Sequence, residues 1–146
     1  MTATRRTARE WAIQMLTAAD MNPTDDIQRF IADYWMQISD LDEEDGVQTE
    51  ARGKLKAFAE ERVVGVLSSI KEIDAELVKF LDHWDIYRLG TVERAVLRMG
   101  VWEMKNTDVP KAVIINEAVD LSNWFSSPKS RPLVNGVLDH YAKAID

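Results

Sequence analysis

Apolar side chains recur along nearly the whole chain at intervals of three and four residues, the spacing of one face of an α-helix. The clearest run occupies residues 8–19, and similar runs follow as far as residue 145. No stretch of four to eight residues alternates polar and apolar side chains as a half-buried strand would. The sequence therefore predicts an all-α fold of about seven helices, with short connections that favour antiparallel neighbours.

Turn and capping residues predict where several of these helices begin. We expect Pro23 at the first position of the second helix and an acidic loop over residues 39–48. A long third helix is expected over about residues 49–71, with Asp74 capping the fourth helix and Ser130 capping the last. Pro128 and Pro132 would then bracket a short polar loop before the last helix.

Composition excludes several classes of protein. At 146 residues, the chain is expected to form a single domain over residues 1–146. It has no cysteine, so disulfides, thiolate nucleophiles and cysteine metal sites are excluded. No apolar run is long enough for a membrane span, and there is no signal-peptide core. These features favour a cytoplasmic protein that does not contact a membrane.

No motif for catalysis or for a metal is present. The two histidines, His83 and His140, are not at ligand spacing. The acidic run from Asp40 superficially resembles a calcium loop, but it lacks the glycine and glutamate that an EF-hand requires at its sixth and twelfth positions. We therefore expect no enzyme activity, no metal and no cofactor.

Acidic residues are concentrated in one part of the chain. The net charge is −7, and residues 20–50 hold ten acidic residues and one arginine. The remaining residues together are slightly basic, and charges farther apart than about 8–10 Å are screened at physiological salt. A local basic face for nucleic acid is therefore compatible with the acidic total.

Arg5, Arg6 and Arg9 form a basic cluster at the start of the first predicted helix. Cations oppose the dipole at a helix N-terminus, so stability alone favours acidic residues there. Arg5 and Arg9 share a helix face, and we expect all three guanidinium groups to point into solvent, where they can bind phosphate. The alternative is that three surface arginines only aid solubility.

The loop before the last helix is a second basic candidate. Lys129 and Arg131 lie among serines at the start of a helix, where side chains and backbone N–H groups together can hold a phosphate. An ordinary solvated loop is the equal alternative. Asn116 and Asn135 interrupt apolar helical patterns, and we expect both amides to be buried and to bond helix ends or loop backbone as structural residues.

Four motifs occur in order along the chain: Arg5-Arg6-Thr7-Ala8-Arg9-Glu10, ERxxLR from Glu93, VPxxVxINEAVxL from Val109, and VNGVLD from Val134. Together they resemble the NusB family of transcription antitermination factors over nearly the whole chain. The resemblance implies two small helical bundles packed together in one domain.

The resemblance also implies partners. In the NusB family the basic start of the first helix contacts single-stranded boxA RNA, which assigns Arg5, Arg6 and Arg9 to RNA. Glu93 matches an acidic position near the contact with ribosomal protein NusE. Thr17 stands where relatives often have a tyrosine, and Leu133 stands where they often have an aromatic residue that could stack on a base.

The leading hypothesis is a factor that binds boxA-type RNA with NusE and modifies the elongating RNA polymerase on ribosomal RNA operons. A non-RNA-binding helical adaptor or homodimer on the same fold is the main alternative, and the acidic segment favours it. The third hypothesis is a helical domain of the kind found in ribosomal RNA cytosine methyltransferases. It is the weakest of the three, because nothing in this chain could bind a methyl donor.

Overall fold

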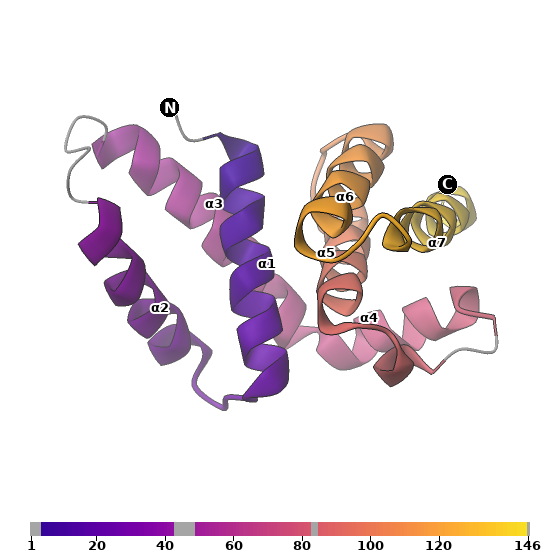
Figure 1. Cartoon of the computed structure of the whole chain (residues 1–146), viewed down its shortest axis with the longest axis horizontal. Helices are drawn as coiled ribbons and strands as arrows, with labels where there is room; N and C mark the ends of the chain where they lie inside the picture. Colours follow the sequence, from indigo (N-terminus) through magenta and orange to yellow (C-terminus); the bar gives the residue numbers. More distant parts are fainter. Residues whose placement is uncertain (1–3, 43–48, 83–84, 146) are drawn as a thin grey trace. The chain divides into compact units, whose positions relative to one another are not determined.

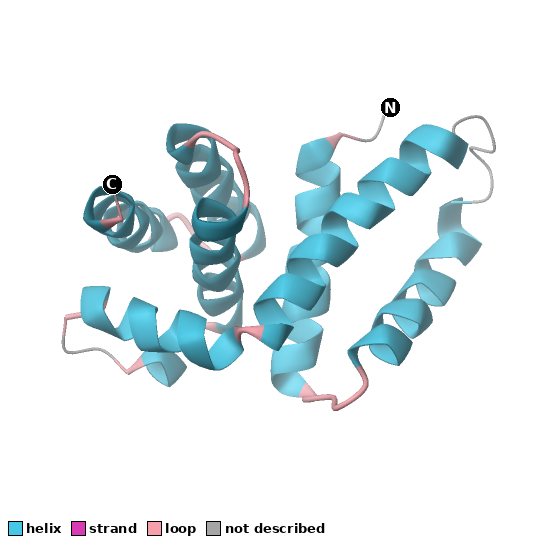
Figure 2. Cartoon of the chain, turned by 180° about the vertical axis from the view of Figure 1, so that it is seen from behind, coloured by secondary structure: helices cyan, strands magenta, loops and turns pink. Residues whose placement is uncertain are grey.

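The computed structural model describes residues 4–42, 49–82 and 85–145. Within these ranges the chain forms seven α-helices, two short 3-10 helices and no strand (Figures 1 and 2). The chain divides into two compact units, Met1–Leu67 and Ser68–Asp146, and each is a small helical bundle. The prediction of an all-α fold with two small bundles is confirmed. No described helix is both long and apolar enough to cross a membrane.

The first unit contains α1 (Arg5–Met21), α2 (Ile27–Asp42) and α3 (Thr49–Ser68). The predicted apolar face of α1 is buried. Trp11 on that face meets Trp35 of α2 edge to face at 5.4 Å, and the Trp35 indole N–H donates to Glu60 of α3. This aromatic and polar chain of contacts joins the three helices, which Figure 1 shows from indigo to magenta.

The second unit contains α4 (Ile70–Leu77), η2 (Val78–Phe80), η3 (Ile86–Arg88), α5 (Thr91–Asn106), α6 (Lys111–Phe125) and α7 (Ser130–Ala144). Helix α5 packs against α4, α6 and α7, and its residues 93–104 are all buried. A helix enclosed in this way needs internal partners for its charged side chains.

Two buried arginines of α5 find those partners. Arg98 holds the Asp74 carboxylate of α4 with two hydrogen bonds of 2.8 Å, and Arg94 donates to the carbonyls of Ile86 and Leu89. The prediction that Asp74 caps the fourth helix is therefore wrong, because this residue lies inside α4 and binds Arg98. The helix begins four residues earlier, after Ser69.

Two other predicted boundaries are wrong. Helix α2 begins at Ile27, because the Asp26 carboxylate accepts the backbone N–H of Arg29 at 3.1 Å and so caps the helix in place of the Pro23 start. The same helix continues through Asp42, so residues 39–42 of the expected acidic loop are helical. The remainder of that loop, residues 43–48, lies outside the described residues.

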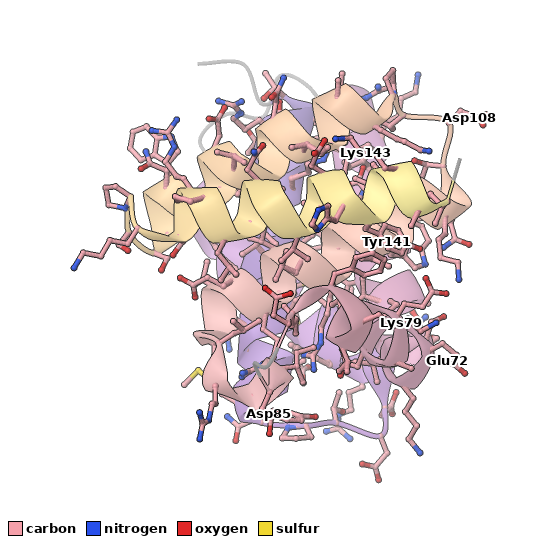
Figure 3. The ribbon with its side chains drawn as sticks, turned by 90° about the vertical axis from the view of Figure 1, so that its right-hand side faces the viewer. Glu72, Lys79, Asp85, Asp108, Tyr141 and Lys143 are labelled. Carbon is pink, nitrogen blue, oxygen red and sulfur yellow. The ribbon has the colours of Figure 1, made fainter. Side chains whose placement is uncertain are left out.

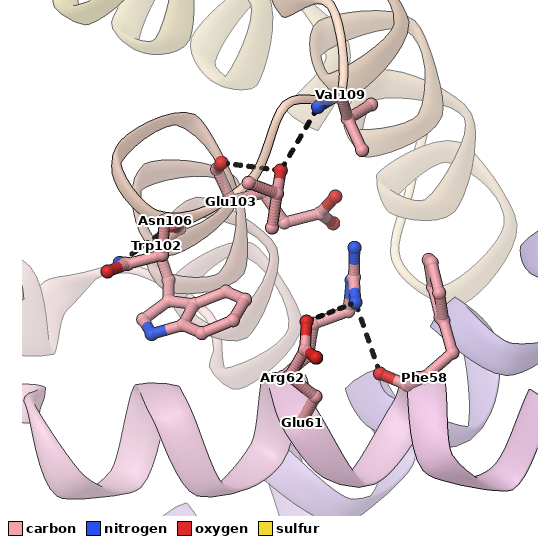
Figure 4. Close-up of polar contacts among 8 residues, drawn as sticks. Phe58, Glu61, Arg62, Trp102, Glu103, Asn106 and Val109 are labelled. Atoms are coloured by element: carbon pink, nitrogen blue, oxygen red, sulfur yellow. Dashed lines mark hydrogen bonds and ion pairs between the residues drawn. The ribbon is translucent and has the colours of Figure 1, made fainter.

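The end of α5 leads directly into α6. The Thr107 hydroxyl donates to the Glu103 carbonyl at 2.8 Å and accepts the Val109 N–H at 3.3 Å, which turns the chain toward Pro110 (Figure 4). Helices α6 and α7 are antiparallel, since Lys111 at the start of α6 donates to the Ala142 carbonyl at the end of α7.

The C-terminal half of α7 is tied to α4. The Tyr141 hydroxyl donates to Glu76 at 2.8 Å, and Figure 3 shows Tyr141 and Lys143 on opposite sides of the last turns of α7. The connection from α6 enters at the opposite end of α7, where Lys129 and Arg131 lie.

Candidate nucleic-acid interface

A reciprocal cap fixes where α1 begins. The Thr4 hydroxyl accepts the Thr7 backbone N–H at 3.4 Å, and the Thr7 hydroxyl accepts the Thr4 N–H at 3.2 Å. This is the capping-box arrangement with threonine in the third helical position. It places Arg5 and Arg6 in the first turn, where both side chains are exposed.

Arg9 does not point into solvent as predicted. It is only 3 % exposed, and its guanidinium carbon lies 5.1 Å from the centre of the Phe58 ring of α3. Position 9 adjoins Ala8 and Ala12 on the inner face of α1, so its stem packs with the core while its head meets an aromatic face. The expected shared face is confirmed, because Arg5 also lies over Phe58, at 5.7 Å.

A third arginine, Arg62 of α3, also contacts the Phe58 ring, and the sequence analysis did not predict this contact. The Arg62 guanidinium stacks 3.4 Å from the ring centre, donates to the Phe58 carbonyl at 3.2 Å and pairs with Glu61 at 3.4 Å (Figure 4). Phe58 and Arg62 are four residues apart on α3, a spacing that brings side chains together and could have signalled the pair. The ring thus organises the basic start of α1.

The second basic region is the connection between α6 and α7. Lys129 and Arg131 are both exposed, as a role in binding phosphate would require. Ser130 does not cap α7 as predicted: it is buried in the first turn, and Lys129 occupies the cap position without a side-chain hydrogen bond. The serine hydroxyl has a different acceptor.

That acceptor is Glu93, in the first turn of α5. The Ser126 and Ser130 hydroxyls both donate to Oε1 of Glu93, and the two hydroxyl oxygens lie 3.2 Å apart. Gly90 makes room for the carboxylate, since a Cβ there would overlap Oε2 of Glu93. We call this group, consisting of Gly90, Glu93, Ser126 and Ser130, the loop clamp.

The clamp keeps Glu93 ionised. Burial is the largest single influence and raises the pKa of the Glu93 carboxyl, but the hydrogen bonds from Ser126, Ser130 and its own backbone, together with the charge of Arg94, outweigh burial and hold the pKa below its usual value. Glu93 is 9 % exposed and binds its own loop, which gives it a structural role that the sequence did not predict. Its contact with a protein partner stays a prediction.

The two asparagines are exposed, so the prediction of buried amides is wrong. On α6 the buried apolar positions are Ile114, Ala118 and Leu121, and Asn116 lies about 200° around the helix from Ile114. On α7 Asn135 lies at the edge of the face formed by Val134 and Leu138. Adjacency to apolar residues in sequence did not imply burial.

The sequence model of the NusB family matches residues 6–143. The transcription antitermination protein NusB of Wolinella succinogenes is 41% identical over 137 residues, which cover 94% of this chain and 93% of the relative. That of Nitratiruptor is 38% identical over 98% of this chain and 94% of the relative. These names describe a transcription factor and confirm the prediction that the chain is not an enzyme.

Solved structures of NusB proteins also resemble this chain. Thermotoga maritima NusB superposes with a TM-score of 0.80 at 27% identity, covering 98% of this chain and 93% of that one. A crystal structure of antitermination factors NusB and NusE with double-stranded RNA gives a TM-score of 0.75 at 28% identity, with 96% of each chain covered. On the family match, the identities and these superpositions, the chain belongs to the NusB family.

Proposed function

We propose that this chain is a transcription antitermination factor that binds boxA-type single-stranded RNA together with ribosomal protein NusE. The complex would act on the RNA polymerase elongation complex at ribosomal RNA operons, in the cytoplasm. The observation on which the proposal depends is the family match over residues 6–143. A structure of antitermination factors NusB and NusE with double-stranded RNA supports NusE and RNA as partners, and the single-stranded boxA form is part of the proposal.

The geometry supports a role by binding and assembly. Arg5 and Arg6 are exposed residues at the start of α1, where their side chains can neutralise RNA phosphates. Arg9, held over Phe58, supports that turn from inside instead of binding the RNA backbone directly. Lys129 and Arg131 supply a second exposed cationic segment, on the other unit.

Salt dependence of RNA binding tests the proposal. Arg5→Ala and Arg6→Ala should each weaken binding of a boxA-type oligonucleotide and reduce the slope of log K against log salt by about 0.7 for each phosphate that is no longer neutralised. Arg29→Ala is the matched control, since Arg29 is an exposed arginine within the acidic segment. Unchanged slopes in both N-terminal variants would refute this site.

RNA binding can also be compared with and without NusE, and between single-stranded and double-stranded RNA. The proposal predicts tighter RNA binding when NusE is present, and a preference for a single strand over a duplex of the same sequence. The adaptor or homodimer alternative would instead hold if light scattering shows a dimer and the protein binds neither RNA form, with or without NusE.

A further inference from the structure

Trp124, in the last turn of α6, is 75 % exposed. Tryptophan is usually highly buried, because its large ring gains much from leaving water. Its neighbours Asn123 and Ser126 are exposed polar residues, and only Phe125 beside it is a partly exposed apolar one. The indole is therefore an exposed aromatic surface with polar neighbours along the chain and one exposed aromatic neighbour, Phe125.

The exposed charge along the chain near this tryptophan is positive. Residues 121–135 contain no acidic residue, although the chain has 25, and their two charged side chains are Lys129 and Arg131. The nearest acidic residue in sequence, Asp120, is partly buried one turn earlier on α6, and the Glu93 carboxylate of the loop clamp is buried. The exposed groups thus favour an anionic ligand.

The loop clamp fixes this segment. The contact between the Ser126 and Ser130 hydroxyls, and their shared bond to Glu93, joins the end of α6 to the start of α7. Trp124 lies two residues before the first serine, and Arg131 lies one residue after the second. The aromatic ring and the cations therefore project from one braced segment, which lowers the entropy lost when a ligand orders them.

We propose that the Trp124 indole stacks on an RNA base while Lys129 and Arg131 bind the adjoining phosphates. Aromatic stacking next to a basic groove is the common way in which proteins hold single-stranded nucleic acid. This inference rests on the proposed function and adds to it a base-contacting residue on the second unit. Stacking tolerates any base, so Trp124 contributes affinity for unpaired RNA more than sequence choice.

The test compares wild type, Trp124→Ala, Trp124→Phe and Lys129→Ala on a boxA-type single-stranded oligonucleotide at several salt concentrations. Loss of one base stack should weaken binding of Trp124→Ala by roughly 5- to 100-fold with an unchanged salt slope. Trp124→Phe should retain most of the affinity, since a ring remains. Lys129→Ala should show the reverse pattern, with a reduced slope and a loss of affinity that is largest at low salt and shrinks as the salt concentration rises.

Abasic RNA isolates the stack. On an oligonucleotide of the same length carrying abasic spacers, wild type and Trp124→Ala should bind equally, because no base is left to stack. RNA should also quench the fluorescence of wild type more than that of Trp124→Phe. The substitution is at an exposed position, and circular dichroism with thermal unfolding verifies that each variant is folded.

The outcomes separate this inference from the proposed function. If wild type binds RNA and Arg5→Ala lowers the salt slope, but Trp124→Ala binds like wild type, the stacking proposal alone is overturned. If Trp124→Ala weakens binding of NusE in the absence of RNA and leaves RNA affinity intact, Trp124 is a protein contact and the stacking proposal is again overturned. If wild type binds no RNA, both proposals fail.

Discussion

The two basic regions of this protein differ in which charged group the fold buries. At the start of α1, the buried charge is a cation: Arg9 lies over Phe58, and Arg5 and Arg6 remain exposed. At the α6–α7 connection, the buried charge is the Glu93 carboxylate, and both cations stay outside. The sequence therefore shows that a helix start is basic. Which of its charged side chains reach solvent depends on where the buried face of the helix begins.

The largest effect should come from removing the carboxylate of the loop clamp. Glu93→Ala leaves two serine hydroxyls without their acceptor, and each hydrogen bond to a charged group contributes about 1.5–3 kcal/mol. We expect the free energy of unfolding to fall by about 3 kcal/mol in urea denaturation. Asp139→Ala is the control, because its surface ion pair with Lys143 should contribute less than about 1 kcal/mol.

If Glu93→Ala were no more destabilising than Asp139→Ala, the clamp would not brace the loop. The claim that a buried carboxylate supports the α6–α7 connection would then be contradicted.

Stability should also separate Arg9 from Arg5. Arg9→Ala removes a buried stem and its contact with Phe58, and we expect a loss of about 1–2 kcal/mol. Arg5→Ala removes an exposed side chain and should cost less than about 0.5 kcal/mol. In RNA binding the order should reverse, with the larger change in salt slope in Arg5→Ala. Equal stability losses in the two variants would contradict the contrast between a buried and an exposed arginine.

Two glycines offer a smaller, matched test of the clamp. An added Cβ at Gly90 would displace the Glu93 carboxylate from its serines, so Gly90→Ala should destabilise by about 1 kcal/mol. Gly53 on α3 has no atom within 4 Å of an added Cβ, and Gly53→Ala should stabilise by about 0.5–1 kcal/mol through helix propensity. Thermal unfolding should therefore shift in opposite directions, and a shift in the same direction would show that the carboxylate relocates at no cost.

The helical spacing of apolar residues predicted the features that depend on local sequence alone. The buried face of α1 and the extent of α5 follow from the apolar pattern, because 3.6 residues per turn fix which side chains share a side. The predicted start at Pro23 is wrong because the nearby Asp26 carboxylate accepts the backbone N–H of Arg29, and the helix begins at Ile27, four residues after Pro23.

The candidate site was less accessible to sequence reasoning, because its decisive contacts are distant in the chain. Ser126 and Ser130 lie 33 and 37 residues from Glu93, and no pattern links them. Phe58 is likewise far from Arg9, so the burial of that arginine could not be read from α1 alone. Sequence located the basic segments, and only tertiary packing decides which of their charges reach solvent.

The smallest expected effect is the pH dependence of the clamp. The folded pKa of Glu93 is lowered from 4.5, so the carboxylate stabilises the fold above pH 4.5, and that stabilisation is lost as the pH falls through the lower folded pKa. Glu93→Gln removes the charge, so the difference in free energy of unfolding between wild type and this variant should shrink as the pH falls below 4.5. Denaturation midpoints measured in steps from about pH 6 to about pH 3 check this.

Glu76 provides the internal reference for that titration. Hydrogen bonds from Lys105 and Tyr141 also lower its pKa, and this contribution is present in wild type and in Glu93→Gln alike. Subtracting one curve from the other therefore leaves Glu93 alone. A difference that stays constant across this pH range would mean that the serines hold the glutamine as well as they hold the carboxylate. The clamp would then depend on hydrogen-bond geometry, and the contrast between a buried anion and a buried cation would not explain how the two basic regions are supported.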